Sequence, residues 1–227
     1  MKKYGVLLAG LFCMLMTGCA SQKAWVYDSN DYDFQPKLTD KKIVVLPFKD
    51  KRDGENKNNI LMYMIPLMPF GPMDMSAPEG SQMHVNTGLW TNYKPAEDYA
   101  KALAEELDGT GLFKESYFDY KAGDADYVIK GELLSTRYKG KLLTYGLSVY
   151  GPMLWFVGLP ASTVTTELGV ELSLVNATTD QVVFSRKYDA TPIQKMSFLF
   201  KLHNDFTYAE MLKEVYWKFC NDLYEKI

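Results

Sequence analysis

The sequence predicts a single α+β domain in which a mixed or antiparallel β-sheet is backed by two main helices. Apolar and polar residues alternate between residues 163 and 175, as in a strand that buries one face. Two segments, which begin near Pro95 and Thr207, repeat apolar residues at helical spacing. Along the chain the order is strand, helix, strand, strand, hairpin and helix. A chain of 227 residues that is 47% hydrophobic can build one core of this kind.

The first strand and the first helix are expected between residues 41 and 109. "KKIVVLPF" holds an apolar run from Ile43 to Leu46, and Pro47 lies near the strand's end or on an edge because it cannot donate to a ladder. A polar loop, "KDKRDGENKNN", follows. The helix starts at Pro95 and ends at Gly109 and Gly111. Its predicted buried face contains Ala96, Tyr99, Ala100, Leu103, Ala104 and Leu107.

Two strands, a hairpin and a second helix complete the domain. "LFKESYFDY" and "ADYVIKGELLSTRY" are the two strands, and "NATTDQ" is the turn that joins residues 163–175 to "VVFSRKY". The last helix starts at Thr207, and Glu210 three residues later predicts a capping box. In residues 163–175 the expected inner face holds Leu168, Val170, Leu172 and Leu174, and in the last helix it holds Tyr208, Leu212, Val215, Phe219 and Leu223.

The first twenty residues, "MKKYGVLLAGLFCMLMTGCA", have the features of an export signal. Lys2 and Lys3 precede an apolar run that is too short to span a bilayer. "LMTGC" resembles the lipobox of bacterial lipoproteins. The resemblance implies that residues 1–18 are removed by a cut between Gly18 and Cys19. It also implies that Cys19 then carries a diacylglyceryl group on its sulfur and a fatty acid such as palmitate on its amino group.

The lipobox also implies a location and a domain organisation. In enteric bacteria an Asp after the lipidated Cys retains a lipoprotein in the inner membrane; Ala20 follows here, which favours the outer membrane and its periplasmic face. We expect residues 19–40 to be the lipid anchor and a tether, and residues 41–227 to be the periplasmic domain. Four aromatic residues of the tether are candidates for packing on that domain: Trp25, Tyr27, Tyr32 and Phe34. Cys220, on the apolar face of the last helix, is expected to be a buried thiol.

The periplasmic domain is similar to a group of lipoprotein domains that includes the curli secretion channel lipoprotein CsgG and the amino-terminal domain of TolB. The similarity rests on "KKIVVLPFKDKRDG", on a helix ending "LDGTGLFKE", on "ADYVIKGEL" and on "VELSLVNATTDQVVFSRKY". It covers residues 41–55 and 95–226. The chain resembles a family of uncharacterised bacterial outer-membrane lipoproteins more closely than it resembles this group. Members of the wider group mostly bind, scaffold or form pores, which is what the resemblance implies here.

No catalytic, metal or cofactor site is expected. His84 and His203 are far apart and lack a metal-ligating neighbour at helical spacing. "GLSVYG" around Ser148 is one residue too long for a nucleophile elbow. A net charge of −3 without a clustered basic face argues against a nucleic-acid partner.

Two apolar insertions, at about residues 58–73 and 142–160, interrupt the order of strands and helices. The first reads "NNILMYMIPLMPFGPM", and the second contains "YGLSVYGPMLWFVGLP". Three interpretations stay open: extra core, a contact surface for a protein or for a second copy, or shallow insertion into the outer membrane. Ten residues are the candidate contacts with a partner or a membrane: Met62, Met64, Ile65, Leu67, Phe70, Tyr150, Met153, Leu154, Trp155 and Phe156.

These observations predict a lipid-anchored binding or assembly module at the outer membrane, and not an enzyme. Its expected partners are the membrane, through the acyl chains on Cys19, and a protein or further copies of the chain. The alternative is an oligomeric pore or export-channel component of the CsgG type. An enzyme that acts on envelope polymers is the third possibility, and it lacks a nucleophile or an acid–base pair.

Overall fold

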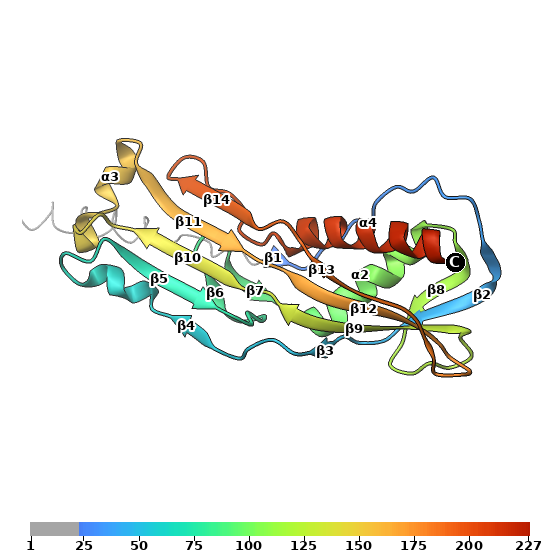
Figure 1. Cartoon of the computed structure of the whole chain (residues 1–227). Helices are drawn as coiled ribbons and strands as arrows, with labels where there is room; N and C mark the ends of the chain where they lie inside the picture. Colours follow the sequence, from blue (N-terminus) through green and yellow to red (C-terminus); the bar gives the residue numbers. More distant parts are fainter. Residues whose placement is uncertain (1–22) are drawn as a thin grey trace, which may run out of the picture.

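Three long strand segments run along the whole molecule in the computed structural model, which describes residues 23–227 (Figure 1). Each segment is interrupted near its middle by two or three residues, so that the chain passes from one sheet into another. The predictions for the signal, for the cut after Gly18 and for lipidation of Cys19 lie outside the described residues. The three segments are β9 (Tyr127–Ser135) with β10 (Tyr138–Leu143), β11 (Pro160–Thr166) with β12 (Gly169–Asn176), and β13 (Val182–Asp189) with β14 (Ile193–Phe198).

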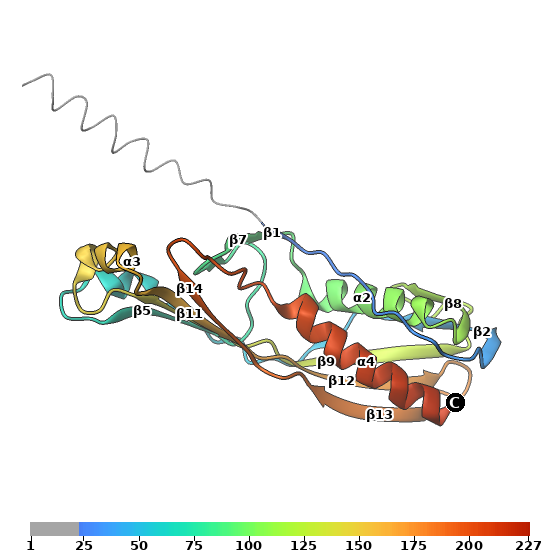
Figure 2. The same cartoon turned by 90° about the horizontal axis from the view of Figure 1, so that it is seen from above.

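The body is the half of the molecule that carries the helices. Its sheet has the order β13-β12-β9-β2-β8, where β2 (Leu38–Val45) is parallel to β9 and to β8 (Phe113–Phe118). The short strand β3 (Lys49–Asp50) also pairs with β9. The helices α2 (Pro95–Gly109) and α4 (Tyr208–Lys226) cover one face of this sheet (Figure 2). The predicted α+β fold with a mixed sheet and two main helices is therefore confirmed.

The arm is the other half. Its sheet has the order β14-β11-β10-β5-β4, with β4 (Asn56–Asn58) and β5 (Phe70–Met75) on one side of β10. Short helices lie at its far end: η1 (Ile60–Met64), η2 (Ser148–Tyr150) and α3 (Met153–Phe156). A small sheet of β1 (Lys23–Ala24), β7 (Gly88–Thr91) and β6 (Met83–His84) lies beside the junction of arm and body.

Two local predictions differ from the structure. The segment 163–175 is not one strand, because the chain leaves the arm sheet after Thr166 and enters the body sheet at Gly169. The capping box at α4 does not form, because the Thr207 hydroxyl shares a hydrogen bond with the Thr166 hydroxyl instead of capping the helix. The strands β4, β5 and β10 were not predicted, since they lie within or beside the apolar insertions, and β14 was not predicted either.

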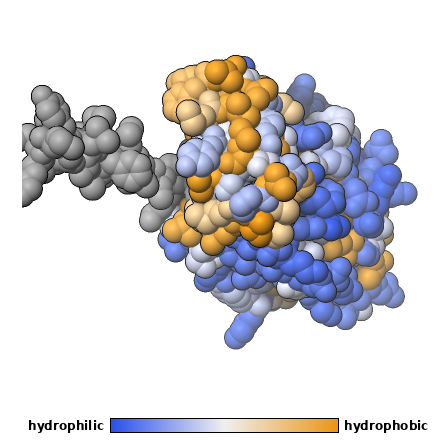
Figure 3. Space-filling model, turned by 90° about the vertical axis from the view of Figure 1, so that its left-hand side faces the viewer, coloured by the Kyte–Doolittle hydropathy of each residue, from blue (hydrophilic) through white to orange (hydrophobic). Residues whose placement is uncertain are grey.

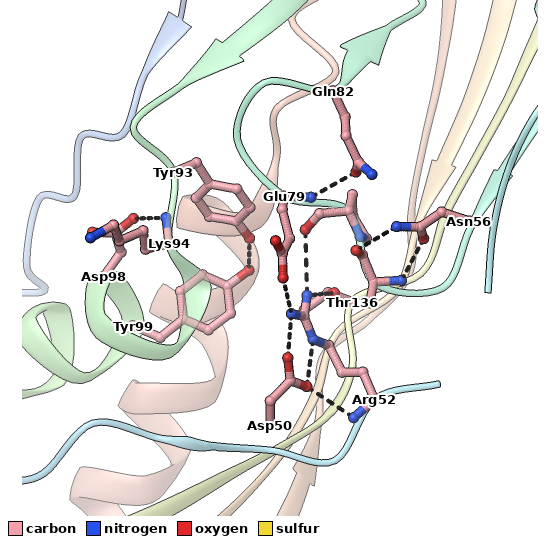
Figure 4. A network of polar contacts seen from close by, with 12 residues as sticks. Asp50, Arg52, Asn56, Glu79, Gln82, Tyr93, Lys94, Asp98, Tyr99 and Thr136 are labelled. Carbon is pink, nitrogen blue, oxygen red and sulfur yellow. Dashed lines mark hydrogen bonds and ion pairs between the residues drawn. The ribbon is translucent and has the colours of Figure 1, made fainter. Parts of the chain in front are cut away.

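A buried arginine joins the arm to the body (Figure 4). Arg52 makes two parallel hydrogen bonds to Asp50, of 2.9 Å from Nε and 2.6 Å from Nη2. Its Nη1 also donates to the Thr136 hydroxyl at 2.7 Å, at the break between β9 and β10. These hydrogen bonds hold the pKa of the Asp50 carboxyl below its usual value. The break is therefore fixed by a charge-assisted network.

Residues 25–38 lie along the body, although they belong to the segment expected to be a tether. Glu106 of α2 is fully buried and accepts hydrogen bonds from Tyr27, Asn30 and Tyr32, with the Tyr27 hydroxyl at 2.7 Å. All four aromatic residues named above pack against the core, and Phe34 stacks on Tyr224 of α4 at 4.6 Å. The side chain of Cys220 is buried as predicted, and burial raises the pKa of its thiol.

Candidate functional site

The two apolar insertions meet at the far end of the arm, and a third segment joins them. Figure 3 shows apolar residues gathered at this end of the molecule. We call this surface the tip, and it consists of residues 60–70, 143–160 and 196–202. The third segment, "MSFLFKL", follows β14, and its apolar run is too short to stand out in the sequence. Phe200 from this segment lies edge-on to Phe156 of α3, with ring centroids 6.4 Å apart. Three segments that are distant in sequence therefore build one surface.

Backbone contacts hold the tip segments to one another. Leu67 donates its backbone N–H to the carbonyl of Gly146 at 3.1 Å, and the Ser148 hydroxyl donates to the carbonyl of Met64. Gly71 must be glycine, because a Cβ atom there would lie 1.8 Å from the Ile60 carbonyl oxygen. Gly151 is similarly constrained by the backbone of Thr144. At both positions the glycine, which has no Cβ atom, lets two backbone segments of the tip region pack closely against each other.

The tip keeps its apolar side chains exposed. Leu67 is 87% exposed, Phe200 83%, Val157 76% and Tyr150 69%. The interpretation as extra core holds only for part of the first insertion, where Met73 is buried in the core and Ile60 packs against it. The remaining parts of the insertions contact each other at the tip. They form a continuous apolar surface at one end of the molecule, and such surfaces usually mark an interaction site. The other exposed apolar side chains here are Leu61, Met64, Ile65, Leu147, Val149, Met153, Phe156, Leu159, Met196 and Leu202.

The ten candidate contact residues divide into two groups. Six of them are exposed on the tip: Met64, Ile65, Leu67, Tyr150, Met153 and Phe156. Met62, Phe70, Leu154 and Trp155 are half-buried and support the loops from below. Trp155, for example, ties α3 to the end of β10, because its ring Nε1–H donates to the carbonyl of Leu143 at 2.8 Å. Sequence reasoning found the surface but missed Val157, which lies within the second insertion, and Phe200 and Leu202, which join the surface only through folding.

The three tip segments are free of charge up to Lys201. Residues 60–73 and 142–166 contain no Asp, Glu, Lys, Arg or His, and neither do residues 196–200. Acidic side chains at the base are paired, Asp74 with Arg137 at 2.9 Å and Glu167 with Lys139 at 3.2 Å. Lys141 lies over the Phe70 ring, 4.8 Å from its centroid, and Lys201 is exposed near the end of the third segment. The tip is therefore apolar with a basic margin.

A cleft of about 210 Å³ opens at the base of the tip. Its polar groups bond to one another: the Ser162 hydroxyl donates to the Asn86 amide oxygen at 2.7 Å, and the Asn86 amide donates to Ser197 at 3.1 Å. The remaining lining is apolar and consists of Val85, Leu142, Trp155, Ala161, Leu199 and Leu202. The cleft therefore continues the apolar character of the tip inward.

The part of the chain that the structure describes offers little catalytic geometry. Within residues 23–227 no three His, Cys, Asp or Glu side chains lie close enough to hold a metal ion. His84 is buried, and desolvation lowers its pKa to about 3, so its ring is neutral. Ser148 donates to a backbone carbonyl. The absence of an enzyme activity stays a prediction. No helix in the described residues has the length and apolar character needed to cross a bilayer.

Comparisons with known proteins place the fold but not the function. No protein-family model and no curated protein matches the sequence. The structure is similar to protein XCC0632 from Xanthomonas campestris, of family DUF330, with a TM-score of 0.50, 9% identity, and coverage of 90% of this chain and 95% of that one. Two further matches have lower scores. Protein CT253 from Chlamydia trachomatis has a TM-score of 0.39 and 8% identity over 81% of this chain and 95% of its own.

The third match is a homolog of neuraminyllactose-binding hemagglutinin from Helicobacter pylori. It has a TM-score of 0.40 and 8% identity over 89% of this chain and 94% of that one. At such identities a likeness concerns the fold alone. The expected relation to the CsgG and TolB group stays a prediction.

Proposed function

We propose that this chain is a lipid-anchored envelope protein that acts as a binding module on the periplasmic face of the outer membrane. Cys19 is the anchor, the body and arm form a rigid support, and the tip is the surface that makes contact. The observation that carries the proposal is the exposure of the tip, where three segments, free of charge up to Lys201, place large apolar side chains outward. A soluble domain gains nothing from such exposure unless another surface covers it.

The construction of the support agrees with a binding role. The Arg52 network fixes the break between body and arm, and reciprocal backbone hydrogen bonds fix the tip loops. Leu67 has a positive φ of 69°, a conformation that costs a residue with a Cβ atom about 1 kcal/mol or more. This strained backbone conformation directs an apolar side chain into solvent, which agrees with a role of Leu67 in contact.

The test uses the full chain in a double-membraned bacterium. We expect mass spectrometry to find the acyl groups on Cys19, and fractionation to place the chain in the outer membrane. A photo-crosslinking residue at Val157 should form adducts with an envelope component, whereas the same residue at Tyr120, an exposed position on the body, should not. An unmodified amino terminus, or equal adducts at both positions, would contradict the proposal.

A second candidate function is an oligomeric channel component. Within the described residues, β14 and β4 are the edge strands of the arm sheet, and each pairs with one neighbour in that sheet. An open edge can accept a strand from another copy. Light scattering of the detergent-solubilised chain distinguishes the candidates, because a channel requires a ring of copies and a binding module does not.

A further inference from the structure

We propose that the surface which covers the tip is the lipid bilayer that carries the anchor, so that the domain lies along the membrane and is attached at two points. This inference rests on the proposed function, because it requires Cys19 to be lipidated. It names the occupant of the tip as a phospholipid surface. A protein partner and a second copy of the chain are the competing occupants.

The chain between Cys19 and the first strand is short, which limits how far the domain can lie from the membrane. Cys19 precedes Lys23, the first residue of β1, by four positions, which span at most about 14 Å. From Trp25 onward the chain is packed on the body, and Glu106 holds it there. A lipidated Cys19 therefore keeps β1 close to the membrane surface, and the domain cannot stand far off it.

The tip and β1 lie on the same side of the molecule. In Figure 2 the upper side is formed by α3, by the loop after β14 and by β7 with β1, while the carboxyl end of α4 lies away from it. Exposed apolar side chains continue along the small sheet, at Met83 in β6 and Leu89 in β7, and Val26 follows β1. A flat surface can therefore touch the tip and the start of β1 together.

The backbone of the tip is prepared for an environment without water. The N–H groups of Met62, Ile65, Leu67 and Met68 donate to backbone carbonyls within the tip and at its edge. In the second segment the same is true of eight N–H groups, those of Leu147, Tyr150, Gly151, Leu154, Trp155, Val157, Gly158 and Leu159. Lipid cannot replace a missing hydrogen bond, so loops that enter it must satisfy their own backbone.

The side chains also fit a bilayer better than a protein partner. Protein interfaces surround an apolar centre with polar groups and bond them across the contact. The tip segments instead contain no charge up to Lys201, and their Trp155 and Tyr145 rings donate inward, Trp155 to Leu143 and Tyr145 to the Pro160 carbonyl at 2.6 Å. Lys141 and Lys201 lie at the margin, where anionic headgroups would meet them.

The experiment uses the chain from residue 20, which retains every helix and strand of the structure and lacks the lipid. We expect it to float with vesicles of phosphatidylethanolamine and phosphatidylglycerol. The triple variant Leu67→Asp, Phe156→Asp, Phe200→Asp should bind about 100-fold more weakly or worse, since three apolar side chains no longer enter the lipid. All three positions are exposed, so the fold should survive, and circular dichroism checks this.

The matched control places the same charges on the body, as Tyr120→Asp, Val182→Asp and Trp217→Asp. These side chains are also large, apolar and exposed, and the control should bind vesicles like the parent chain. A second readout attaches an environment-sensitive fluorophore to Leu67→Cys, where Cys220 does not compete because it is buried. Its emission should shift to the blue on vesicles, and the same label at Tyr120→Cys should not respond.

The outcomes separate the bilayer from its competitors. If the parent chain fails to float while Val157 crosslinks to a protein in the envelope, the bilayer inference is overturned and the proposed function stands. If the parent chain forms a dimer that the triple variant abolishes, the occupant is a second copy and the inference is likewise overturned. Flotation that the control triple abolishes equally would place the lipid contact elsewhere and would also refute it.

Discussion

The amino-terminal segment and the tip are opposites in composition and in burial. Residues 25–38 are rich in polar residues, yet they pack on the helices and place two tyrosines and an asparagine on a buried carboxylate. The tip segments are the most apolar of the described chain, yet they protrude. Polarity alone therefore does not decide which segment is covered.

The difference lies in what each segment meets. Glu106 on α2 is fully buried, and a buried carboxylate requires donors, which the amino-terminal segment supplies. The tip loops meet one another and the end of the arm, because the arm sheet extends beyond the reach of α2 and α4 (Figure 1). A segment is buried when the fold covers it, and within the described residues nothing covers the outward side chains of the tip.

The largest effect is expected when Glu106 is changed. Glu106→Ala leaves the donors of Tyr27, Asn30 and Tyr32 unpaired in a buried site, which should lower the free energy of unfolding by about 3 kcal/mol. Urea denaturation measures the loss.

The amino-terminal segment should also loosen, and limited trypsin digestion should then cut at Lys37 before the body is digested. Glu105→Ala is the matched control, since that side chain is exposed. Protection of Lys37 in Glu106→Ala would contradict this account of the segment.

The second largest effect is a loss of stability at acidic pH, caused by the buried His84. The ring of His84 is stacked on Trp90 at 3.4 Å, and desolvation lowers its pKa to about 3, against about 6.5 in an unfolded chain. The unfolded state thus binds more protons below pH 6.5, so stability is present above that pH and is lost as the pH falls. Between pH 7 and pH 5 we expect a loss of about 2 kcal/mol. Urea titrations of the parent chain and of His84→Phe measure it, and an equal loss in both would show that His84 is not responsible.

A smaller effect separates stability from binding at the tip. Leu67→Gly removes the Cβ atom from a residue at φ 69°, which should stabilise the fold by about 1 kcal/mol. The same change deletes the most exposed leucine of the tip and should weaken vesicle binding. Thermal unfolding and flotation, made on the same samples, measure the two effects. Unchanged binding in the stabilised variant would show that Leu67 does not reach the lipid.

The smallest effect tests the basic margin. Lys141→Gln should reduce binding to anionic vesicles by about fivefold at low salt, since one lysine near such a surface contributes about 1 kcal/mol. The reduction should disappear at high salt, where charges are screened. Lys114→Gln, an exposed lysine on the body, is the matched control. A reduction that is independent of salt would indicate that Lys141 acts through its contact with Phe70 instead.

Several features followed from local sequence. The helices α2 and α4 and the strands β2, β8, β9 and β13 were predicted, because each has a periodicity or a punctuating residue within its own length. The insertions were recognised as anomalous for the same reason. The arm was not predicted, since β5, β10 and β14 are identified as strands through their pairing with one another and with β11.

The sequence by itself determined the class of fold, the two helices and the presence of apolar segments that the regular core does not need. The tertiary structure alone decided that these segments are exposed, that Phe200 joins them, and that the expected tether is bound along the body by Glu106. The physical reason is that the burial of a side chain depends on which other segments pack against it. Periodicity reports the face of one element, whereas the long-range contacts that cover or expose that face arise from segments more than fifty residues away, as for Tyr27 and Glu106.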